Sequence, residues 1–356
     1  MDRRTPLCDS FANKSLDASR RMTLLEDSRR RPLRDLRISV TDRCNFRCEY
    51  CMPKDVFNKN FHFMRHADML SFEEIHRLAR IFVAHGVRKI RITGGEPLLR
   101  RHLDRLIGML SQFENIDIAL TTNGVLLPKM AESLKKAGLN RITVSLDALD
   151  NAIFSRMNNA GIPVSQVLDG IAAAEDAGFA PLKINMVVKR GTNDREIMPM
   201  VEHFRGSGHI LRFIEFMDVG ASNGWNMASV VPSREILVGI DRRYPLEPLD
   251  PTHAGEVARR WRFKDGNGEI GMISSVTEAF CSSCTRLRLS TDGRLYTCLF
   301  AREGYDLREL LRSDCDDTAL IDAIGRVWRT REDHYSEVRV ANTPRDGRVE
   351  MSYIGG

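Results

Sequence analysis

Three cysteines within eight residues constrain this chain more than any other feature. Cys44, Cys48 and Cys51 are separated by three and then two residues. Thiolates are soft ligands that select zinc or iron-sulfur centres, and this spacing matches neither the paired Cys-x2-Cys halves of zinc fingers nor the four-cysteine runs of ferredoxins. Three thiolates fill three of four corners, so the pattern predicts an iron centre with one position open to substrate. A zinc site completed from elsewhere in the chain is the alternative.

The residues before this triplet indicate where it lies in a fold. Residues 35–40 (DLRISV) alternate and are rich in β-branched side chains, which is typical of a strand. The cysteine loop therefore follows the carboxyl end of a strand, where α/β folds place their chemistry.

A second triplet strengthens the prediction of metal centres. Cys281 and Cys284 are followed by Cys298, again without an obvious fourth ligand. Cys315 is a candidate for the fourth, but its acidic surroundings are more typical of a helix boundary. Cys8 is isolated in a polar stretch and is predicted to have no role.

Length and composition predict a large soluble protein. A chain of 356 residues accommodates one barrel-sized domain with an elaboration. No apolar run approaches the roughly 20 residues of a membrane span, and the N-terminus lacks the apolar core of a secretory signal. Six of the eight cysteines form the two triplets, which suits metal binding in a reducing compartment better than disulfides. We therefore expect a cytoplasmic protein that does not bind membranes.

The basic residues suggest an anionic partner. The net charge is only +5, yet arginine and lysine gather at residues 29–31, 88–91, 100–101 and 286–288. Nucleic acid and a small polyphosphate are both candidates, and short arginine pairs beside a metal site favour the polyphosphate because guanidinium groups grip phosphate oxygens in pairs. Solvated surface is the alternative for each cluster.

Strand and helix patterns alternate regularly through the first two thirds of the chain. Ser71 and Glu74 form a capping-box pattern that opens a helix ending near Gly86. Further helices are predicted near residues 100–112, 128–137, 165–177 and 194–204, and strands at 36–40, 87–93, 116–121, 141–146, 182–188 and 211–216. Six βα units with right-handed crossovers predict an α/β fold, an incomplete (βα)6 TIM-type barrel.

The chain is predicted to divide into three parts. Residues 1–30 are polar and aperiodic and read as a flexible N-terminal extension. Residues 31–245 form the partial barrel. Residues 246–356 are shorter, glycine-punctuated segments that carry the second triplet. We expect this C-terminal elaboration to lie across the open side of the barrel, where it covers exposed sheet edges.

Several short motifs resemble one known family. They are TDRCNFRC at residues 41–48, RITGGEP at 91–97, TTNG at 121–124, VSLD at 144–147, RFIEFM at 212–217, the CSSCTRLR segment at 281–288, and the terminal Gly355 and Gly356. In order, they are similar to the radical S-adenosylmethionine (SAM) superfamily, and within it to the nucleotide cyclases that begin molybdenum-cofactor biosynthesis. The resemblance runs from about residue 30 to the end.

The resemblance implies a [4Fe-4S] cluster on Cys44, Cys48 and Cys51 whose free iron binds SAM. Glycines at 94 and 95 allow close backbone approach to the methionyl group, and Glu96 can accept from its ammonium. A plain strand-to-helix turn is the alternative for this motif. The positions matching SAM contacts of the family are Tyr50, Gly95, Glu96, Ser145 and Met217.

It also implies a second [4Fe-4S] cluster on Cys281, Cys284 and Cys298, whose free iron binds the guanine of GTP. The positions matching GTP contacts are Arg37, Arg91, Thr121, Lys183, Arg286, Leu287 and Arg288. Arg286 and Arg288 alternate, so both should face the same side of an extended segment. Arg286, Arg288, Gly355 and Gly356 are the expected catalytic residues, with the glycine tail threading into a crowded site. A frayed terminus is the alternative.

The implied reaction begins when reductive cleavage of SAM yields a 5'-deoxyadenosyl radical, which takes hydrogen from ribose C3' of GTP. Attack on guanine C8 and reduction then give the 3',8-cyclised nucleotide. Implied partners are an electron donor, a downstream cyclic pyranopterin monophosphate synthase, and a second copy in a homodimer. Two other functions stay open: a radical SAM enzyme with an auxiliary cluster that acts on a peptide, and a zinc-dependent nucleic-acid-binding protein.

Overall fold

The computed structural model describes residues 24–313, 316–339 and 347–356. Cys8, Cys315 and the first 23 residues lie outside this part of the chain. The strands are β1 (Asp35–Ser39), β2 (Lys89–Thr93), β3 (Asp117–Thr122), β4 (Arg141–Ser145), β5 (Lys183–Val188), β6 (Ile210–Glu215), β7 (Leu246–Leu249), β8 (Arg259–Phe263), β9 (Glu269–Ile273), β10 (Arg286–Leu289), β11 (Arg294–Tyr296) and β12 (Tyr305–Asp306).

The helices alternate with the first strands and then cluster near the end of the chain. They are α1 (Phe72–Ala84), α2 (Leu103–Leu110), α3 (Leu127–Lys136), α4 (Asn151–Asn158), α5 (Val164–Asp176), α6 (Ile197–Phe204), α7 (Ser233–Asp241), α8 (Arg308–Arg312), α9 (Asp317–Arg329), α10 (Tyr335–Val338) and α11 (Met351–Ile354). The six predicted strands and the five predicted helices are all present, and the βα alternation is confirmed.

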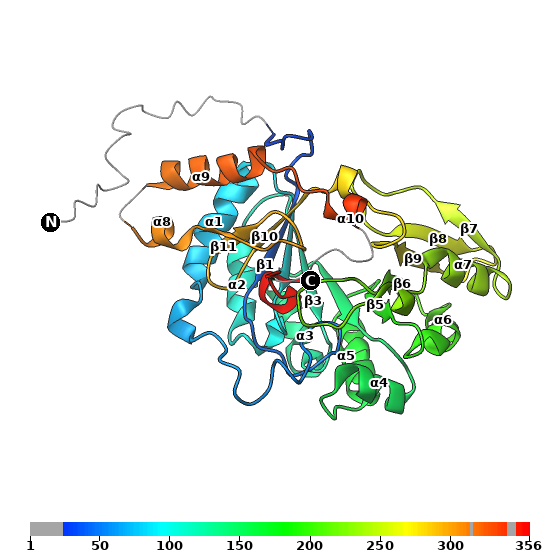
Figure 1. The fold of residues 1–356 in the computed structure, drawn as a ribbon. Coiled ribbons are helices and arrows are strands. Elements are labelled where there is room, and N and C mark those ends of the chain that lie inside the picture. The colour runs from blue at the N-terminus through cyan, green and yellow to red at the C-terminus, as the bar shows by residue number, and fades with distance from the viewer. Residues whose placement is uncertain (1–23, 314–315, 340–346) are drawn as a thin grey trace.

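The strands form one 12-stranded sheet in the order β12-β11-β10-β1-β2-β3-β4-β5-β6-β9-β8-β7 (Figure 1). β1 to β6 are parallel neighbours, as a partial barrel requires. The C-terminal region does more than cover the edges, because β10 pairs parallel with β1 and β9 pairs parallel with β6. It therefore extends the same sheet at both ends, and antiparallel strands complete each flank.

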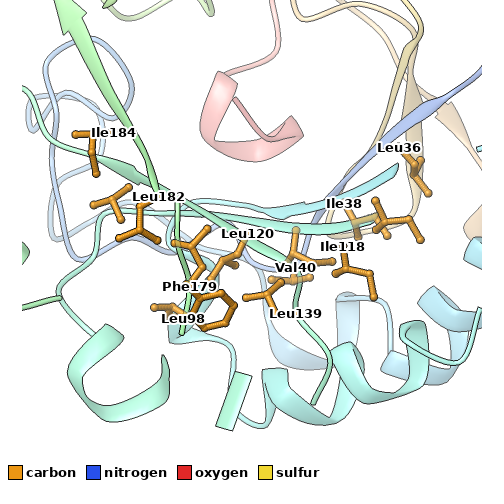
Figure 2. Close-up of a cluster of buried hydrophobic side chains, with 14 of the residues drawn as sticks. Leu36, Ile38, Val40, Leu98, Ile118, Leu120, Leu139, Phe179, Leu182 and Ile184 are labelled. Carbon is orange, nitrogen blue, oxygen red and sulfur yellow. The ribbon is translucent and has the colours of Figure 1, made fainter. Parts of the chain in front are cut away.

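The two faces of the sheet differ in chemistry. Leu36 and Ile38 of β1 are fully buried and belong to the main core. Figure 2 shows these side chains on the helix-covered face, together with Ile118 and Leu120 of β3. Because side chains alternate along a strand, the residues between them point the other way. That second face, which we call the inner face, carries Arg37 and its strand neighbours.

Helix α1 shows how local sequence fixes the elements. The Ser71 hydroxyl accepts a hydrogen bond from the Glu74 amide at 3.1 Å, and the Ser71 amide donates to the Glu74 carboxylate at 2.7 Å. This capping box is worth about 1 kcal/mol. Ile75, Leu78 and Phe82 then recur at helical spacing and are buried against the sheet. The predicted start and the apolar face of this helix are confirmed.

The packed part of the chain begins earlier than predicted. The sequence pattern places residues 24–30 in the flexible extension, but Leu25 is buried in the core and Glu26 forms a β-bridge with Pro32. Asp27 is also buried and pairs with Arg31. A single buried carboxylate and a single leucine leave no periodic signal, which is why sequence patterns did not separate them from the residues before.

Candidate functional site

The first cysteine triplet lies at the carboxyl edge of the parallel strands, directly after β1. The Phe46 amide donates to Cys44 Sγ at 3.3 Å, and the Cys51 and Met52 amides donate to the Cys48 carbonyl at 3.0 and 2.8 Å. These bonds fold the loop into tight turns. All three thiols are carried by this short folded loop. All three thiols are unpaired and partly buried.

The Gly94 and Gly95 turn after β2 holds this loop in place. The Gly95 amide donates to the Thr41 carbonyl at 2.8 Å. A Cβ on Gly95 would lie 2.3 Å from the Arg43 carbonyl oxygen, and one on Gly94 would lie 2.5 Å from that of Thr41. Only glycine allows the two backbones to approach this closely. The glycines thus fix the entrance of the cysteine loop, a role the sequence did not suggest.

Glu96 is buried beneath the same loop. Its carboxylate accepts from the Leu98 amide at 3.0 Å, the Thr122 hydroxyl at 2.7 Å and the Asn123 amide at 2.8 Å. Burial raises its pKa to about 7, against the lowering effect of these donors. Three of its acceptor positions are therefore already engaged inside the protein. Glu96 ties the β2 and β3 ends together, and its contact with a SAM ammonium stays a prediction.

The other residues expected at SAM gather along the same carboxyl edge. Ser145 ends β4 and Met217 follows the end of β6. Tyr50, in the cysteine loop, donates its hydroxyl to Asp147 at 2.8 Å. Since parallel strands end at one edge of a sheet, these positions share one rim with the first triplet. Asp147 itself was missed by the sequence reasoning.

The second cysteine triplet lies at the opposite edge. Cys281 and Cys284 precede β10, and β10 runs parallel to β1 with Arg288 beside Arg37. The first triplet follows β1, which has five residues. The two cysteine sites therefore flank a strand roughly 16 Å long, at about 3.3 Å per residue.

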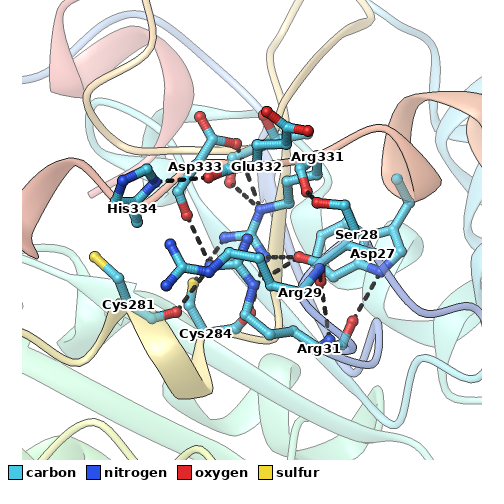
Figure 3. A network of polar contacts seen from close by, with 12 residues as sticks. Asp27, Ser28, Arg29, Arg31, Cys281, Cys284, Arg331, Glu332, Asp333 and His334 are labelled. Carbon is cyan, nitrogen blue, oxygen red and sulfur yellow. Dashed lines mark hydrogen bonds and ion pairs between the residues drawn. The ribbon is translucent and has the colours of Figure 1, made fainter.

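Arginines lie close to Cys281 and Cys284 of the second triplet (Figure 3). Arg286 donates to Cys284 Sγ from Nε at 3.3 Å and from Nη2 at 3.2 Å, and Arg331 Nη2 donates to the same sulfur at 3.1 Å. Burial works against the thiolate, but these guanidinium groups lower the pKa of Cys284 to about 6. Loss of hydration raises the pKa of Cys298 to about 11 and that of Cys44 to about 12. At the second site Cys284 is thus prepared as an anionic sulfur, whereas Cys298 and Cys44 must lose a proton on binding a metal.

Both triplets have the donor chemistry of the clusters that the family resemblance implies, although among the described residues no three such side chains are already arranged around one metal position. Each offers soft thiol ligands that are free and partly buried. At the second site, Arg31 Nη2 is also buried without a hydrogen-bond partner among the described residues. An unsatisfied cationic donor beside a thiol triplet suits a negatively charged cluster.

Positive charge lines the inner face between the two triplets. Arg37 of β1 lies beside Arg91 of β2 in the strand register. Arg91 Nη1 donates to the Thr121 hydroxyl at 2.8 Å. The charged groups that influence one another here also include Lys183, Arg286 and Arg288, and Lys89 from the basic cluster at 88–91. Arg141 and Arg212, which were not predicted, join them. Their place on facing strands, not any motif, brings them together.

The electrostatics of this face favour an anionic ligand. Burial and then neighbouring cations lower the pKa of Lys183 to about 7 and that of Arg212 to about 9. The Nε atoms of Arg37 and Arg91 are buried without hydrogen-bond partners among the described residues. A cavity of about 300 Å³ opens at the amino edge beside Lys183 and Arg212. Repelling cations with unused donors are stabilised when a polyanion binds.

Arg286 and Arg288 lie on the same face of β10, as the alternation predicts, but Leu287 does not join them. In the parallel register of β10 and β1, Arg286 lies beside Asp35 and Arg288 beside Arg37. Leu287 lies beside Leu36 and is fully buried in the main core. With its side chain in the core, Leu287 would have to contact GTP through its backbone, and this contact stays a prediction.

The C-terminal tail enters the inner face. The Gly355 carbonyl accepts a hydrogen bond from Arg288, and a Cβ on Gly355 would lie 2.3 Å from Thr93 Cγ2. Gly355 has φ of 75°, which favours glycine. Figure 1 marks the C-terminus at the centre of the molecule, beside β1 and β3. The described tail is therefore packed, as the threading prediction requires, and is not frayed.

Beneath the tail lies a buried charge cluster. Asp218 Oδ1 pairs with Arg339 Nε at 2.9 Å, and Asp218 Oδ2 lies 3.1 Å from Arg348 Nη1. The Tyr335 hydroxyl donates to Asp218 and accepts from Arg348 Nη2 at 2.6 Å. Glu350 then accepts from the Ala221 amide at 3.1 Å. These contacts fasten the segment that leads to Gly355.

Comparison with known proteins places these features in a family. The Radical SAM superfamily profile matches residues 38–204, and the Molybdenum Cofactor Synthesis C profile matches residues 209–337. The domain boundary expected at residue 245 stays a prediction. No helix in the described residues is long and apolar enough to span a membrane.

Curated relatives match almost the whole chain. The GTP 3',8-cyclase of Acidothermus cellulolyticus is 51% identical over 358 residues, covering 93% of this chain and 99% of the relative. That of Xanthomonas axonopodis pv. citri is 53% identical, also with 93% and 99% coverage. Among solved structures, Streptococcus suis SuiB bound to precursor peptide SuiA has a TM-score of 0.58 at 16% identity, covering 84% of this chain and 64% of that chain. This last likeness concerns the fold alone.

Proposed function

The chain belongs to the GTP 3',8-cyclase family of the radical SAM superfamily, and we propose that it converts GTP to (8S)-3',8-cyclo-7,8-dihydroguanosine 5'-triphosphate, the first step of molybdenum-cofactor biosynthesis. The observation that carries the proposal is the cationic inner face between two cysteine triplets at opposite ends of the same strands. A nucleoside triphosphate has the length and charge to occupy that space.

Cys44, Cys48 and Cys51 would hold a [4Fe-4S] cluster and leave one iron for SAM. When bound and reduced, this pair supplies one-electron cleavage of the sulfonium and hydrogen abstraction from substrate. The protein's part is orientation. Tyr50, bonded to Asp147, fixes the loop from one side, and the Gly95 turn fixes it from the other.

Cys281, Cys284 and Cys298 would hold a second [4Fe-4S] cluster, whose open iron would take the guanine. Arg286 and Arg288 continue from this site along β10 toward the barrel centre. Arg37, Arg91, Lys183 and Arg212 would grip the triphosphate. Its negative charge of about four at neutral pH would relieve the repulsion among these buried cations and satisfy their unused donors.

The Gly355 and Gly356 tail would complete the cavity wall beside Thr93. The Gly355 carbonyl, which accepts a hydrogen bond from Arg288, would orient that guanidinium toward the substrate. Because the two glycines have no side chains, they would leave room for the nucleotide. A closed wall would also keep water and stray hydrogen donors from reactive carbon centres.

The location and partners of the chain are also part of the proposal. The chain would work in the cytoplasm as a homodimer, take electrons from a reductant protein, and pass its product to cyclic pyranopterin monophosphate synthase. The relatives' shared name favours GTP over the peptide substrate and over the zinc-dependent nucleic-acid-binding function.

Anaerobic turnover tests the proposal. Reconstituted protein is incubated with SAM, dithionite and either GTP or ATP, and products are separated by chromatography and mass. We expect about eight irons per chain, and 5'-deoxyadenosine with an equal amount of a cyclised isomer of GTP only in the GTP reaction. A colourless protein with stoichiometric zinc, or SAM cleavage unaffected by GTP and without a cyclised product, would overturn it.

A further inference from the structure

A buried network ties the N-terminal segment to the second cysteine triplet (Figure 3). The Asp27 side chain is 0% exposed, and those of Arg31 and Arg331 are 2% exposed. Asp27 Oδ2 pairs with Arg31 Nε at 2.6 Å and with Arg331 Nη1 at 3.2 Å. Asp27 Oδ1 accepts from the Arg29 and Arg31 amides at 3.0 and 2.9 Å. The carboxylate is thus fully engaged and is the counter-charge shared by two buried cations, of which Arg331 also lies 3.5 Å from Asp333 Oδ2.

The two arginines in turn hold the backbone on both sides of the triplet. Arg31 Nη1 donates to the Cys281 carbonyl at 2.8 Å. Arg331 donates to the Cys284 carbonyl at 2.8 Å, and its Nε donates to the carbonyl of Thr297, the residue before Cys298, at 3.1 Å. One pair of guanidinium groups therefore contacts the peptide at or next to each of the three cysteines.

The network packs against Trp328 of helix α9. The Trp328 ring is fully buried, with the Arg331 guanidinium 4.6 Å from its centroid, and the Trp328 Nε1 donates to the Arg31 carbonyl at 3.1 Å. The Ser28 hydroxyl donates to the Arg331 carbonyl at 2.6 Å. Planar guanidinium groups packed in this way have little freedom to reorient. The carbonyls they bind are held with them.

We propose that Asp27 is a positioning residue for the second cluster: through Arg31 and Arg331 it presets the backbone of Cys281, Cys284 and Cys298 for cluster binding. The proposal rests on the proposed function, which supplies the second cluster. Without the carboxylate, Arg31 loses its ion pair and Arg331 keeps only the longer contact with Asp333, so nothing offsets the repulsion between the two cations and they move apart. The carbonyl groups that they bind are then no longer held in fixed relative positions, although no cysteine has changed.

The test uses the full-length, reconstituted protein with Asp27→Asn and Arg331→Lys. Iron and acid-labile sulfide per chain and the EPR spectrum of each reduced cluster are measured beside SAM cleavage without GTP, which reports the first cluster. We expect both variants to fall from about eight to about four irons, to lose one EPR signal, and to retain SAM cleavage within about twofold. Arg331→Lys keeps the positive charge, so its loss of iron separates guanidinium geometry from charge.

Arg29→Ala is the matched control, because Arg29 lies on the same segment but its side chain forms an exposed pair with Glu337. It should keep about eight irons. Cys284→Ala gives the reference value for a chain without the second cluster. Should Asp27→Asn fail to fold, Arg331→Lys decides the question. Retention of eight irons and both EPR signals in the folded variants would overturn this inference alone, whereas a wild-type chain with only four irons would overturn the proposed second cluster itself.

Discussion

The Arg288 guanidinium donates a hydrogen bond to the Gly355 carbonyl, and so joins strand β10 to the end of the chain. Arg288 is also the strand neighbour of Arg37 on the inner face. One side chain therefore contacts both the cationic surface and the tail that closes it. We therefore propose that the last two residues are part of the site.

Shortening or filling the tail should stop cyclisation without affecting the clusters. Deletion of Gly355 and Gly356 removes the Arg288 contact, so we expect both clusters and SAM cleavage to persist while the cyclised product falls at least 100-fold. Gly355→Ala should act in the same direction, because its Cβ would lie 2.3 Å from Thr93 Cγ2. Product and 5'-deoxyadenosine are quantified together.

Gly191→Ala serves as the control for this pair. Gly191 has φ of 71°, close to the 75° of Gly355, but a Cβ there meets nothing within 4 Å. It reports backbone strain alone and should leave turnover near the wild-type value. Full turnover by the chain lacking both terminal glycines would contradict the assigned role of the tail.

Gly95→Ala should prevent assembly of the first cluster. The added Cβ would lie 2.3 Å from the Arg43 carbonyl oxygen, so the entrance of the cysteine loop must shift. We expect the iron content to fall to about half and SAM cleavage to be lost. Gly108→Ala, in the middle of α2 where a Cβ meets nothing within 4 Å, should leave iron unchanged and stabilise the protein by about 0.5–1 kcal/mol. A Gly95→Ala protein with normal iron content would refute the steric argument.

The affinity for GTP should depend on pH through Lys183. Burial and neighbouring cations lower the pKa of Lys183 to about 7 in the free protein, and its charged form is the one that attracts phosphate. Affinity should therefore weaken as pH rises above about 7. Bound phosphate raises the pKa of Lys183, and the decline should end once the pH exceeds the pKa that Lys183 has in the GTP complex. Binding of GTP is measured from pH 6.5 to 9 in wild type and Lys183→Arg. The arginine stays charged, so that variant should show a flatter profile; identical profiles would exclude Lys183 as the titrating group.

Asp218 should contribute strongly to stability as the counter-charge of Arg339 and Arg348. Asp218→Asn leaves two nearly buried guanidinium groups without their carboxylate, and we expect a loss of about 3–5 kcal/mol in the free energy of unfolding. Denaturant titration measures it. Asp265→Asn breaks the half-exposed pair with Arg205 and should cost less than about 1 kcal/mol. Equal losses would show that burial of the Asp218 cluster contributes nothing.

The sequence predicted features that repeat or cluster along the chain. Helical spacing located α1, alternation located the strands, and the cysteine triplets identified both candidate metal sites. Alternation also placed Arg286 and Arg288 on one face. The same rule directs the side chain of Leu287, which lies between them, to the core.

Features that depend on contacts between distant residues were not predictable. Pairing of β9 and β10 with the edges of the first six strands leaves no local pattern, because it is decided by which edges are free when the sheet forms. Asp27 and Arg331 are single charged residues 304 positions apart. Arg212 lies within a quoted motif, yet only its strand neighbours reveal that it joins the cationic inner face.

Transfer of deuterium from GTP labelled at ribose C3' tests the central claim most directly, namely that the nucleotide lies between the two triplets with its ribose toward the SAM end. We predict that 5'-deoxyadenosine from a single turnover carries one deuterium in proportion to cyclised product, and that GTP labelled at guanine C8 transfers none. Cyclised product formed with unlabelled 5'-deoxyadenosine, or deuterium arriving from C8, would contradict it.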